Sequence, residues 1–186
     1  RKLAEQIETF RKQAAEAGPD VRVSDGQTFK IGGLTLEVVH TPGHTLGSVC
    51  LYLREEKALF TGDTALGLGT VAISPPPHGD MALYLQSLER LKGYDCALML
   101  PGHGQEVHDV KRKLQELIDH RHEREDQILR LMAGGKQTPK AMLSAIYMEL
   151  DKRIVPMALR QIEAHLAKFE AEGRVRRLED EWEVIA

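Results

Sequence analysis

The stretch Thr41-Pro42-Gly43-His44-Thr45 follows residues 34–39, an alternating apolar and β-branched segment that predicts a β-strand. A Pro-Gly pair cannot continue the hydrogen-bond ladder of a strand, so the chain has to turn there and present His44 at the strand's end. Two later short apolar segments repeat this arrangement. One runs into Thr61-Gly62-Asp63 and the other into Pro101-Gly102-His103-Gly104. Strands that each end in a turn carrying a His or an Asp can gather metal ligands along one sheet edge, and zinc sites use such ligands.

The composition is that of a globular protein with one ordinary domain and a small second one. The 186 residues include 25 Lys and Arg against 28 Asp and Glu, a net charge of −3, so no basic excess favours nucleic acid. Cys50 and Cys96 lie in or beside apolar segments, which indicates buried thiols in a reducing compartment. No apolar run approaches the ~20 residues of a membrane helix, so no membrane partner is expected. We expect a cytoplasmic protein. The mitochondrial matrix is the alternative, because a sequence that starts at Arg1 does not decide on a targeting peptide.

Helices and strands are predicted from the spacing of apolar residues and from turns rich in Gly, Pro and Asp. Asp80 is a good N-cap, because its side chain can accept a hydrogen bond from the first turn of a helix. The longest helical stretch, residues 109–133, loses its apolar stripe in the middle, which indicates one helix or two consecutive helices between two packing units. The other predicted elements are a helix over residues 2–17, strands over 21–23, 28–31, 34–39, 48–53, 58–61 and 97–100, and a helix over 81–92.

The last third of the chain has the order of a winged helix. Thr138-Pro139 combines an N-cap with a proline at the first helical position, and a second helix ends at Gly173. Residues 174–178 and 182–185 then alternate as a terminal two-stranded ribbon. We therefore expect a small second domain from about residue 119 onward.

The connection over residues 64–79 is long and includes three consecutive prolines. Long connections without secondary structure are often functional loops, and this one leaves directly after Asp63. Two interpretations stay open: a lid or substrate wall beside the site, or a surface connector with a stiffened end. His78 follows the prolines and is the candidate for substrate contact among the remaining histidines.

The three turns come in the order and at the spacing of the last three metal motifs of the metallo-β-lactamase superfamily, which the chain resembles. Three further features are similar to the β-lactamase-like protein 2 group: the pairs His120-Arg121 and Arg124-Glu125, the helix starting at Asp80-Met81, and the winged helix. That group comprises metal-dependent hydrolases, with glyoxalase-II-like bacterial members and an endoribonuclease of animal mitochondria.

The resemblance covers essentially the whole chain, but only the rear two-thirds of a full-length member. It implies an α+β fold, the C-terminal portion of a metallo-β-lactamase αββα sandwich followed by a small winged-helix domain. Residues 1–118 would form the partial metallo-β-lactamase domain, and residues 119–186 the winged-helix-like C-terminal domain.

The resemblance also implies a cofactor of two zinc ions and a hydrolase activity. His44 would ligate the first metal, Asp63 would bridge the two metals, and His103 would ligate the second. A metal-bound hydroxide would attack an ester, thioester or phosphodiester, with no catalytic side chain beyond the ligands. Imidazoles and a bridging carboxylate suit a pair of Zn²⁺ ions about 3.5–4 Å apart.

One part of the family pattern, a His-x-His-x-Asp-His cluster, has no counterpart in this sequence. The string at residues 120–126 mimics it, but in a helix two residues that are two apart point to different sides and cannot chelate one ion together. A solvated helix face or salt links between domains are expected for that string, rather than phosphate binding. With these three residues, each metal ion would have only two protein ligands, and one of the two, Asp63, would be shared between the ions. We therefore expect a fragment or truncated product that is inactive alone and binds metal weakly.

The alternative function is an RNA- or DNA-binding module built on the winged helix. From residue 134 onward nine basic residues stand against nine acidic ones, whereas a DNA reader should show a basic excess. Arg174, Arg176 and Arg177 form one small basic patch beside acidic residues, so specific DNA binding is not expected. The expected partners are a small ester or thioester substrate or single-stranded RNA, with a homodimer as a further option.

Overall fold

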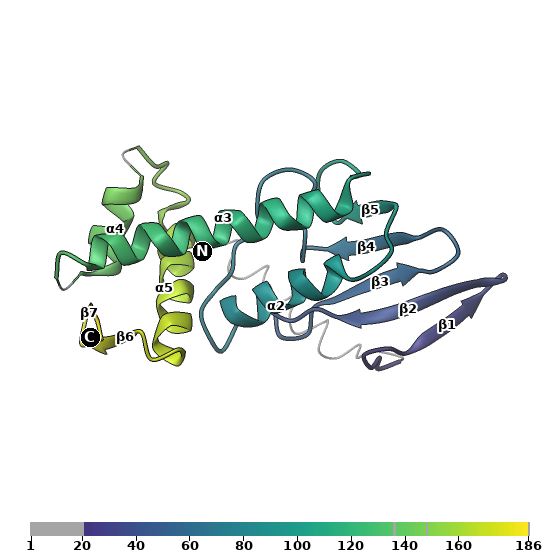
Figure 1. The fold of residues 1–186 in the computed structure, drawn as a ribbon, viewed down its shortest axis with the longest axis horizontal. Coiled ribbons are helices and arrows are strands. Elements are labelled where there is room, and N and C mark those ends of the chain that lie inside the picture. Colours follow the sequence, from purple (N-terminus) through teal and green to yellow (C-terminus); the bar gives the residue numbers. More distant parts are fainter. Residues whose placement is uncertain (1–20, 136, 148, 186) are drawn as a thin grey trace, which may run out of the picture.

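The computed structural model describes residues 21–135, 137–147 and 149–185, and it contains a five-stranded sheet with a helical unit beside it (Figure 1). The strand order is β1-β2-β3-β4-β5. Strands β1 to β4 are antiparallel neighbours, and β5 pairs with β4 in parallel. As a result, β2, β4 and β5 all end at the same edge of the sheet. The strands are β1 Thr28–Ile31, β2 Leu34–His40, β3 Val49–Leu53, β4 Ala58–Gly62 and β5 Leu98–Pro101.

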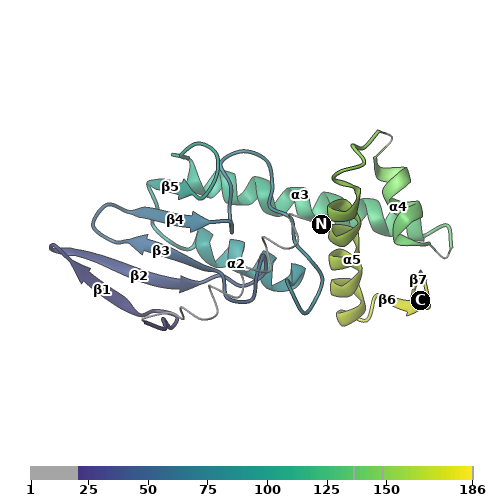
Figure 2. The same cartoon turned by 180° about the vertical axis from the view of Figure 1, so that it is seen from behind.

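Two helices, α2 (Met81–Lys92) and α3 (Val110–Met132), lie on one face of the sheet, as the opposite views of Figures 1 and 2 show. The Asp80 carboxylate caps α2 by accepting the backbone N–H of Leu83 at 2.9 Å, as the sequence predicts. The sheet and both helices share one core of fully buried apolar side chains, which includes Leu59, Met99, Leu88, Leu91 and Leu114.

The other face of the sheet carries a row of apolar side chains, which we call the open face. Its members are paired across neighbouring strands, so they point the same way. Ile31 is 60% exposed and Phe60 is 39% exposed. The residues of the open face line a shallow hollow of about 260 Å³: Ile31, Leu34, Leu36, Leu51, Leu53 and Phe60.

The second unit consists of the C-terminal half of α3, two further helices and a ribbon. It has its own core, in which Ile128 and Met132 of α3 meet Met142, Phe169 and Trp182. The elements are α4 Pro139–Ile146, α5 Val155–Ala171, β6 Val175–Leu178 and β7 Glu181–Val184, the last two forming an antiparallel pair. The predicted winged-helix order is confirmed, and α3 is one uninterrupted helix that contributes to both cores.

The predicted strand over Val21–Val23 is wrong. Both valines are exposed, and the chain pairs with β2 only later, where the N–H of Gly26 donates to the carbonyl of Val38 at 2.8 Å. The predicted helix over residues 2–17 lies outside the described residues. Within them, no helix combines the length and the apolar character that a bilayer crossing requires.

The polar middle of α3 contains both kinds of residue that the sequence suggests. His120, His122, Glu123 and Asp126 are solvent-exposed. Arg121 and Glu125, one turn apart on the opposite face, are buried and bonded to other elements. Glu125 lies 3.0 Å from the ammonium group of Lys168 on α5, and Arg121 donates to the side chain of Gln161 on the same helix at 2.8 Å.

Candidate metal centre

The fold brings His44, Asp63 and His103 together at the edge where β2, β4 and β5 end, and we call these three residues the metal trio. The two histidines approach different oxygens of the carboxylate. His44 Nε2 lies 3.9 Å from Asp63 Oδ2, and His103 Nε2 lies 3.6 Å from Asp63 Oδ1. Their side chains are 29%, 44% and 77% exposed in chain order. The site is therefore open to solvent, most of all at His103.

The ring of His44 is oriented by the backbone of the loop over residues 64–79. Nδ1 lies 2.9 Å from the carbonyl oxygen of Ala72, which can only accept, so Nδ1 carries the proton. The lone pair is then on Nε2, the atom that faces Asp63. Metal-bound histidines usually donate their second ring N–H in this way. Ala72 carries no sequence signal for this role, because only its carbonyl takes part.

The His44 turn is held against α2 by backbone and side-chain hydrogen bonds. The N–H of Asp80 donates to the carbonyl of Gly43 at 2.9 Å, and the hydroxyl of Ser87 donates to the carbonyl of Pro42 at 2.8 Å. Gly43 has φ +143°, and a Cβ there would lie 2.3 Å from Cα of Tyr84. A glycine at position 43 is thus required by close packing on α2 as well as by the turn itself.

Asp63 and His103 are held by the adjoining ends of the parallel strands. The N–H of Gly102 donates to the carbonyl of Gly62 at 2.8 Å, which ties the two turns together. A Cβ at Gly67 would lie 2.0 Å from the carbonyl oxygen of Gln105, so the loop over residues 64–79 packs directly on the His103 turn. These contacts join segments far apart in sequence.

The trio fits part of a metal centre. Zn–N and Zn–O bonds of about 2.0–2.2 Å separate two tetrahedral ligand atoms by about 3.4 Å, which is near the 3.6 Å between His103 and Asp63 and shorter than the 3.9 Å between His44 and Asp63. A carboxylate with one imidazole at each oxygen suits a bridge between two ions. Each position has only two donors, however, and in the described ranges no group of three or more His, Cys, Asp or Glu is arranged to hold an ion.

The loop over residues 64–79 has no helix or strand, but its middle is firmly packed. Ala65, Val71 and Ile73 are buried in the sheet-and-helix core, and the carbonyl of Val71 accepts the Arg121 guanidinium at 2.6 Å. His78 is exposed near the end of the loop, and its role in substrate contact stays a prediction. The middle of the loop forms a fixed wall behind His44.

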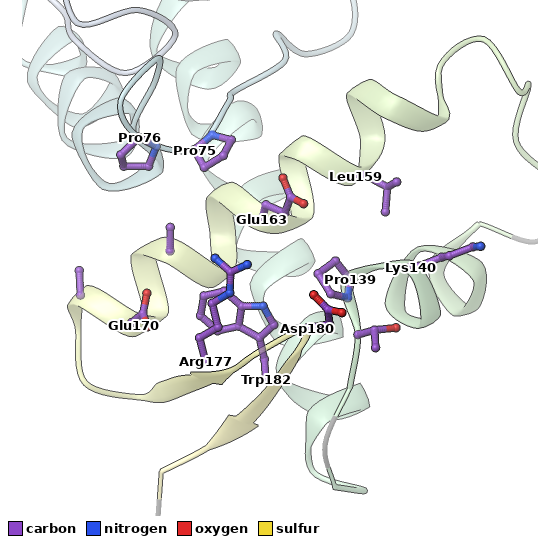
Figure 3. Close-up of a pocket in the computed structure, with 13 residues that line it drawn as sticks. Pro75, Pro76, Pro139, Lys140, Leu159, Glu163, Glu170, Arg177, Asp180 and Trp182 are labelled. Carbon is purple, nitrogen blue, oxygen red and sulfur yellow. The ribbon is translucent and has the colours of Figure 1, made fainter.

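A groove of about 810 Å³ separates the prolines of this loop from the winged-helix unit (Figure 3). Pro75 and Pro76 lie across from Arg177 and Trp182 of the ribbon, with Glu163 on α5 between them. The groove is lined by both signs of charge and by none of the metal trio, so it is a separate feature of the surface.

The arginines in and next to the ribbon already form hydrogen bonds or ion pairs within this unit. Arg176 is bonded to Glu183 across the two strands, Arg177 donates to the carbonyl of Glu179 at 3.0 Å, and Arg174 lies 3.4 Å from a carboxylate oxygen of Glu172. The charge of the patch is thereby partly offset, which weakens it as a nucleic-acid surface.

Two protein-family models match the chain. The model described as the metallo-beta-lactamase superfamily matches residues 2–103, and the model described as the beta-lactamase associated winged helix domain matches residues 138–182.

Relatives are found among curated sequences. The chain is 35% identical over 137 residues to an atrochrysone carboxyl ACP thioesterase of Aspergillus fumigatus, and 34% identical over 160 residues to the beta-lactamase-like protein 2 homolog of Drosophila melanogaster. These matches cover 67% and 83% of this chain, and 42% and 52% of the two relatives. The chain therefore spans about half of the length of these relatives.

Solved structures share the fold over nearly the whole chain. A beta-lactamase domain protein from Burkholderia ambifaria superposes with a TM-score of 0.83 at 25% identity, covering 91% of this chain and 54% of its own. A metallo-beta-lactamase family protein from Thermus thermophilus superposes with a TM-score of 0.79 at 25% identity. The match covers 90% of this chain and 55% of the Thermus protein. Together these matches confirm the resemblance and the fold class that the sequence predicts.

Proposed function

The chain belongs to the metallo-beta-lactamase superfamily, and from this membership we propose that it takes part in metal-dependent hydrolysis of an ester or thioester, with His44, Asp63 and His103 as metal ligands. The observation that supports the proposal best is the pair of imidazoles at the two oxygens of one carboxylate. The fixed tautomer of His44 adds to it, because the hydrogen bond to Ala72 leaves the ligating nitrogen free.

A thioester is the favoured substrate because a relative at 35% identity is named a thioesterase. A phosphodiester in RNA is less favoured, since the three ribbon arginines are engaged with carboxylates or a carbonyl. Fold alone does not choose between substrates, because one site type serves many reactions on one fold.

The geometry supports a proposed role for each of the three residues. His44 and His103 each present Nε2 of the imidazole ring, and Asp63 presents one oxygen to each of them. Divalent zinc bound there would supply Lewis-acid activation of water and of the scissile carbonyl. Two donors at each position fall short of the three or four that zinc sites use, so we propose that a working centre needs further donors and that the trio alone binds metal weakly.

Metal binding tests the proposal without relying on activity. We expect Co²⁺, titrated into the purified chain and followed by its visible absorption, to bind weakly, and His103→Ala to weaken that binding by about tenfold or more because one of the few donors is lost. The matched control is His108→Ala, which removes an exposed imidazole next to Glu106 and should leave the titration unchanged.

Hydrolysis is measured separately with a small acyl thioester and a thiol reagent, on this chain and on a longer protein that carries a His-x-His-x-Asp-His cluster ahead of this sequence. Metal-dependent turnover by the longer protein that disappears in His103→Ala supports the hydrolase assignment. Equal Co²⁺ binding by the wild type and His103→Ala would contradict the ligand assignment. Two tightly held zinc ions in the purified chain would contradict the proposed shortage of donors.

A further inference from the structure

A cavity of about 190 Å³ lies between α3, α5 and the loop over residues 64–79, and we call it the α3–α5 cavity. None of the metal trio lines it. Two arginines and two histidines line it, together with a threonine hydroxyl and an aromatic ring: Arg121, Arg124, His120, His165, Thr70 and Tyr147. The residues that line the cavity include no carboxylate, so its walls are formally cationic.

Nitrogen atoms of both arginines are buried without a hydrogen-bond partner in the part of the chain that the structure describes. They are Nε of Arg121 and Nη1 of Arg124; the ring nitrogens of His165 are also buried, and its Nδ1 lies 3.5 Å from Oε1 of Glu125. Arg121 is 2% exposed and His165 is 0% exposed. A buried polar group left unpaired costs about 1–3 kcal/mol, and a charged one costs more, so this cluster calls for a partner with acceptor atoms.

The two guanidinium groups are held in place before any ligand arrives. Arg121 donates to the carbonyl of Val71 at 2.6 Å and to the side chain of Gln161 at 2.8 Å. Arg124 stacks on the ring of Tyr147, with its central carbon 4.7 Å from the ring centre. Such fixed planar donors match the oxygens of a phosphate group and lose little entropy on binding.

The charges around the cavity also favour an anion. Partial desolvation lowers the pKa of His120, although its side chain stays partly exposed, and the guanidinium groups of Arg121 and Arg124 lower it further against the opposing effect of Glu123. The nearest buried carboxylate, Glu125, has an oxygen 3.0 Å from the Lys168 ammonium group and 3.5 Å from His165 Nδ1. Lys168 neutralises the negative charge of Glu125. The positive charges of Arg121 and Arg124 are therefore left in excess at the cavity.

We propose that the α3–α5 cavity is a binding site for a phosphoryl group, held by Arg121 and Arg124 with Thr70 and His120 as further donors. A phosphoryl group carries up to two negative charges and several acceptor oxygens, enough to satisfy four or more donors, whereas a carboxylate has only two oxygens. The volume accommodates a phosphate and the first atoms of an attached group. The site stands apart from the metal trio and does not depend on the proposed hydrolysis.

Phosphate binding to the metal-free chain tests this site. Isothermal titration with inorganic phosphate, in EDTA and at constant ionic strength, should show one site. Arg124→Gln should weaken it by about tenfold or more, because a charge-assisted hydrogen bond and one positive charge are lost. The matched control is Arg130→Gln on the exposed part of the same helix, which should bind phosphate like the wild type. His103→Ala should also bind like the wild type, which separates this site from the trio.

A substitute variant and a competition measurement complete the experiment and identify the source of the phosphate group. If Arg124→Gln does not fold, as judged by circular dichroism, His120→Ala replaces it and should also weaken binding. Glycerol 3-phosphate that competes with inorganic phosphate assigns the site to the phosphate group of a larger ligand, and failure to compete assigns it to the free ion. The proposal is overturned if phosphate does not bind, if it binds Arg124→Gln as tightly as the wild type, or if acetate binds equally well.

Discussion

Gly43 stands where the His44 turn passes closest to α2. Its φ of +143° lies outside the range that side-chain-bearing residues prefer, and the space for a Cβ is occupied by the backbone of Tyr84. The neighbouring Gly47 has no heavy atom within 4 Å of the corresponding position. The two glycines therefore carry different structural demands although they lie in the same connection.

We expect Gly43→Ala to destabilise the protein by roughly 2–4 kcal/mol, because backbone strain and overpacking act together at this position. Gly47→Ala is the matched control and should stay within about 0.5 kcal/mol of the wild type. Urea unfolding followed by circular dichroism measures both. Equal stability of the two variants would show that the turn can move away from α2.

Glu55 is a residue whose hydrogen bonds give stability a dependence on pH. The hydroxyl of Thr35 donates to one of its carboxylate oxygens and the backbone N–H of Thr35 to the other, both at 2.7 Å. These bonds lower the pKa of Glu55 from 4.5 to about 2. Because the folded state holds the ionised form, the contribution to stability is complete above the unfolded pKa near 4.5 and is lost as the pH falls toward 2.

Glu55→Gln should therefore reduce the number of protons taken up on unfolding in this acidic range, by up to about one. The slope of unfolding free energy against pH, from urea titrations at several pH values below 5, measures this uptake. Glu56→Gln, a change at the exposed neighbour, is the control and should leave the slope of the wild type intact. An unchanged slope in Glu55→Gln would rule out the Thr35 hydrogen bonds as its source.

At the scale of elements, apolar spacing and turn residues predict most helices and strands, and the turn motifs predict the metal trio. Alternation does not say which face of a strand is covered. In β2, Leu34 and Leu36 lie on the open face, while Thr35 on the other face is buried and bonded to Glu55. The pattern has the correct period, but the side that is covered depends on which helices pack there.

The parts of the site that sequence did not predict are tertiary contacts. The hydrogen bond from His44 to the carbonyl of Ala72 joins segments 28 residues apart and leaves no mark on side-chain identity. The sequence leaves a solvated face and salt links between domains open for the string at residues 120–126, because the partners of Arg121 and Glu125 lie on the loop over residues 64–79 and on α5. Val21 and Val23 have strand-forming side chains but pair with no strand in the described structure.

At the scale of the whole molecule, the sheet is apolar on both faces. Helices cover one face, and the open face exposes parts of Ile31 and Phe60. Such a patch is typical of a surface that another layer covers, as in a two-sheet sandwich.

We expect the open face to bind the dye 8-anilinonaphthalene-1-sulfonate, and Phe60→Lys to reduce its fluorescence by replacing a large apolar side chain of the patch with a charged one. Leu68→Lys is the control, because Leu68 is 84% exposed but belongs to the loop over residues 64–79. Fluorescence titration of both variants with the dye measures whether binding depends on the open face. Equal loss in the two would mean that the dye binds apolar side chains without regard to the open face.

The continuity of α3 bears on how such proteins can be inherited and recombined. Its 23 residues extend for about 35 Å and contribute side chains to both cores. A genetic junction at residue 119 would cut the helix between one and two turns before Glu125, and it would separate Leu114 of the first core from Ile128 of the second. We therefore expect the sheet and the winged helix to be inherited together as one unit. Chimeras that exchange only one of them should fold poorly.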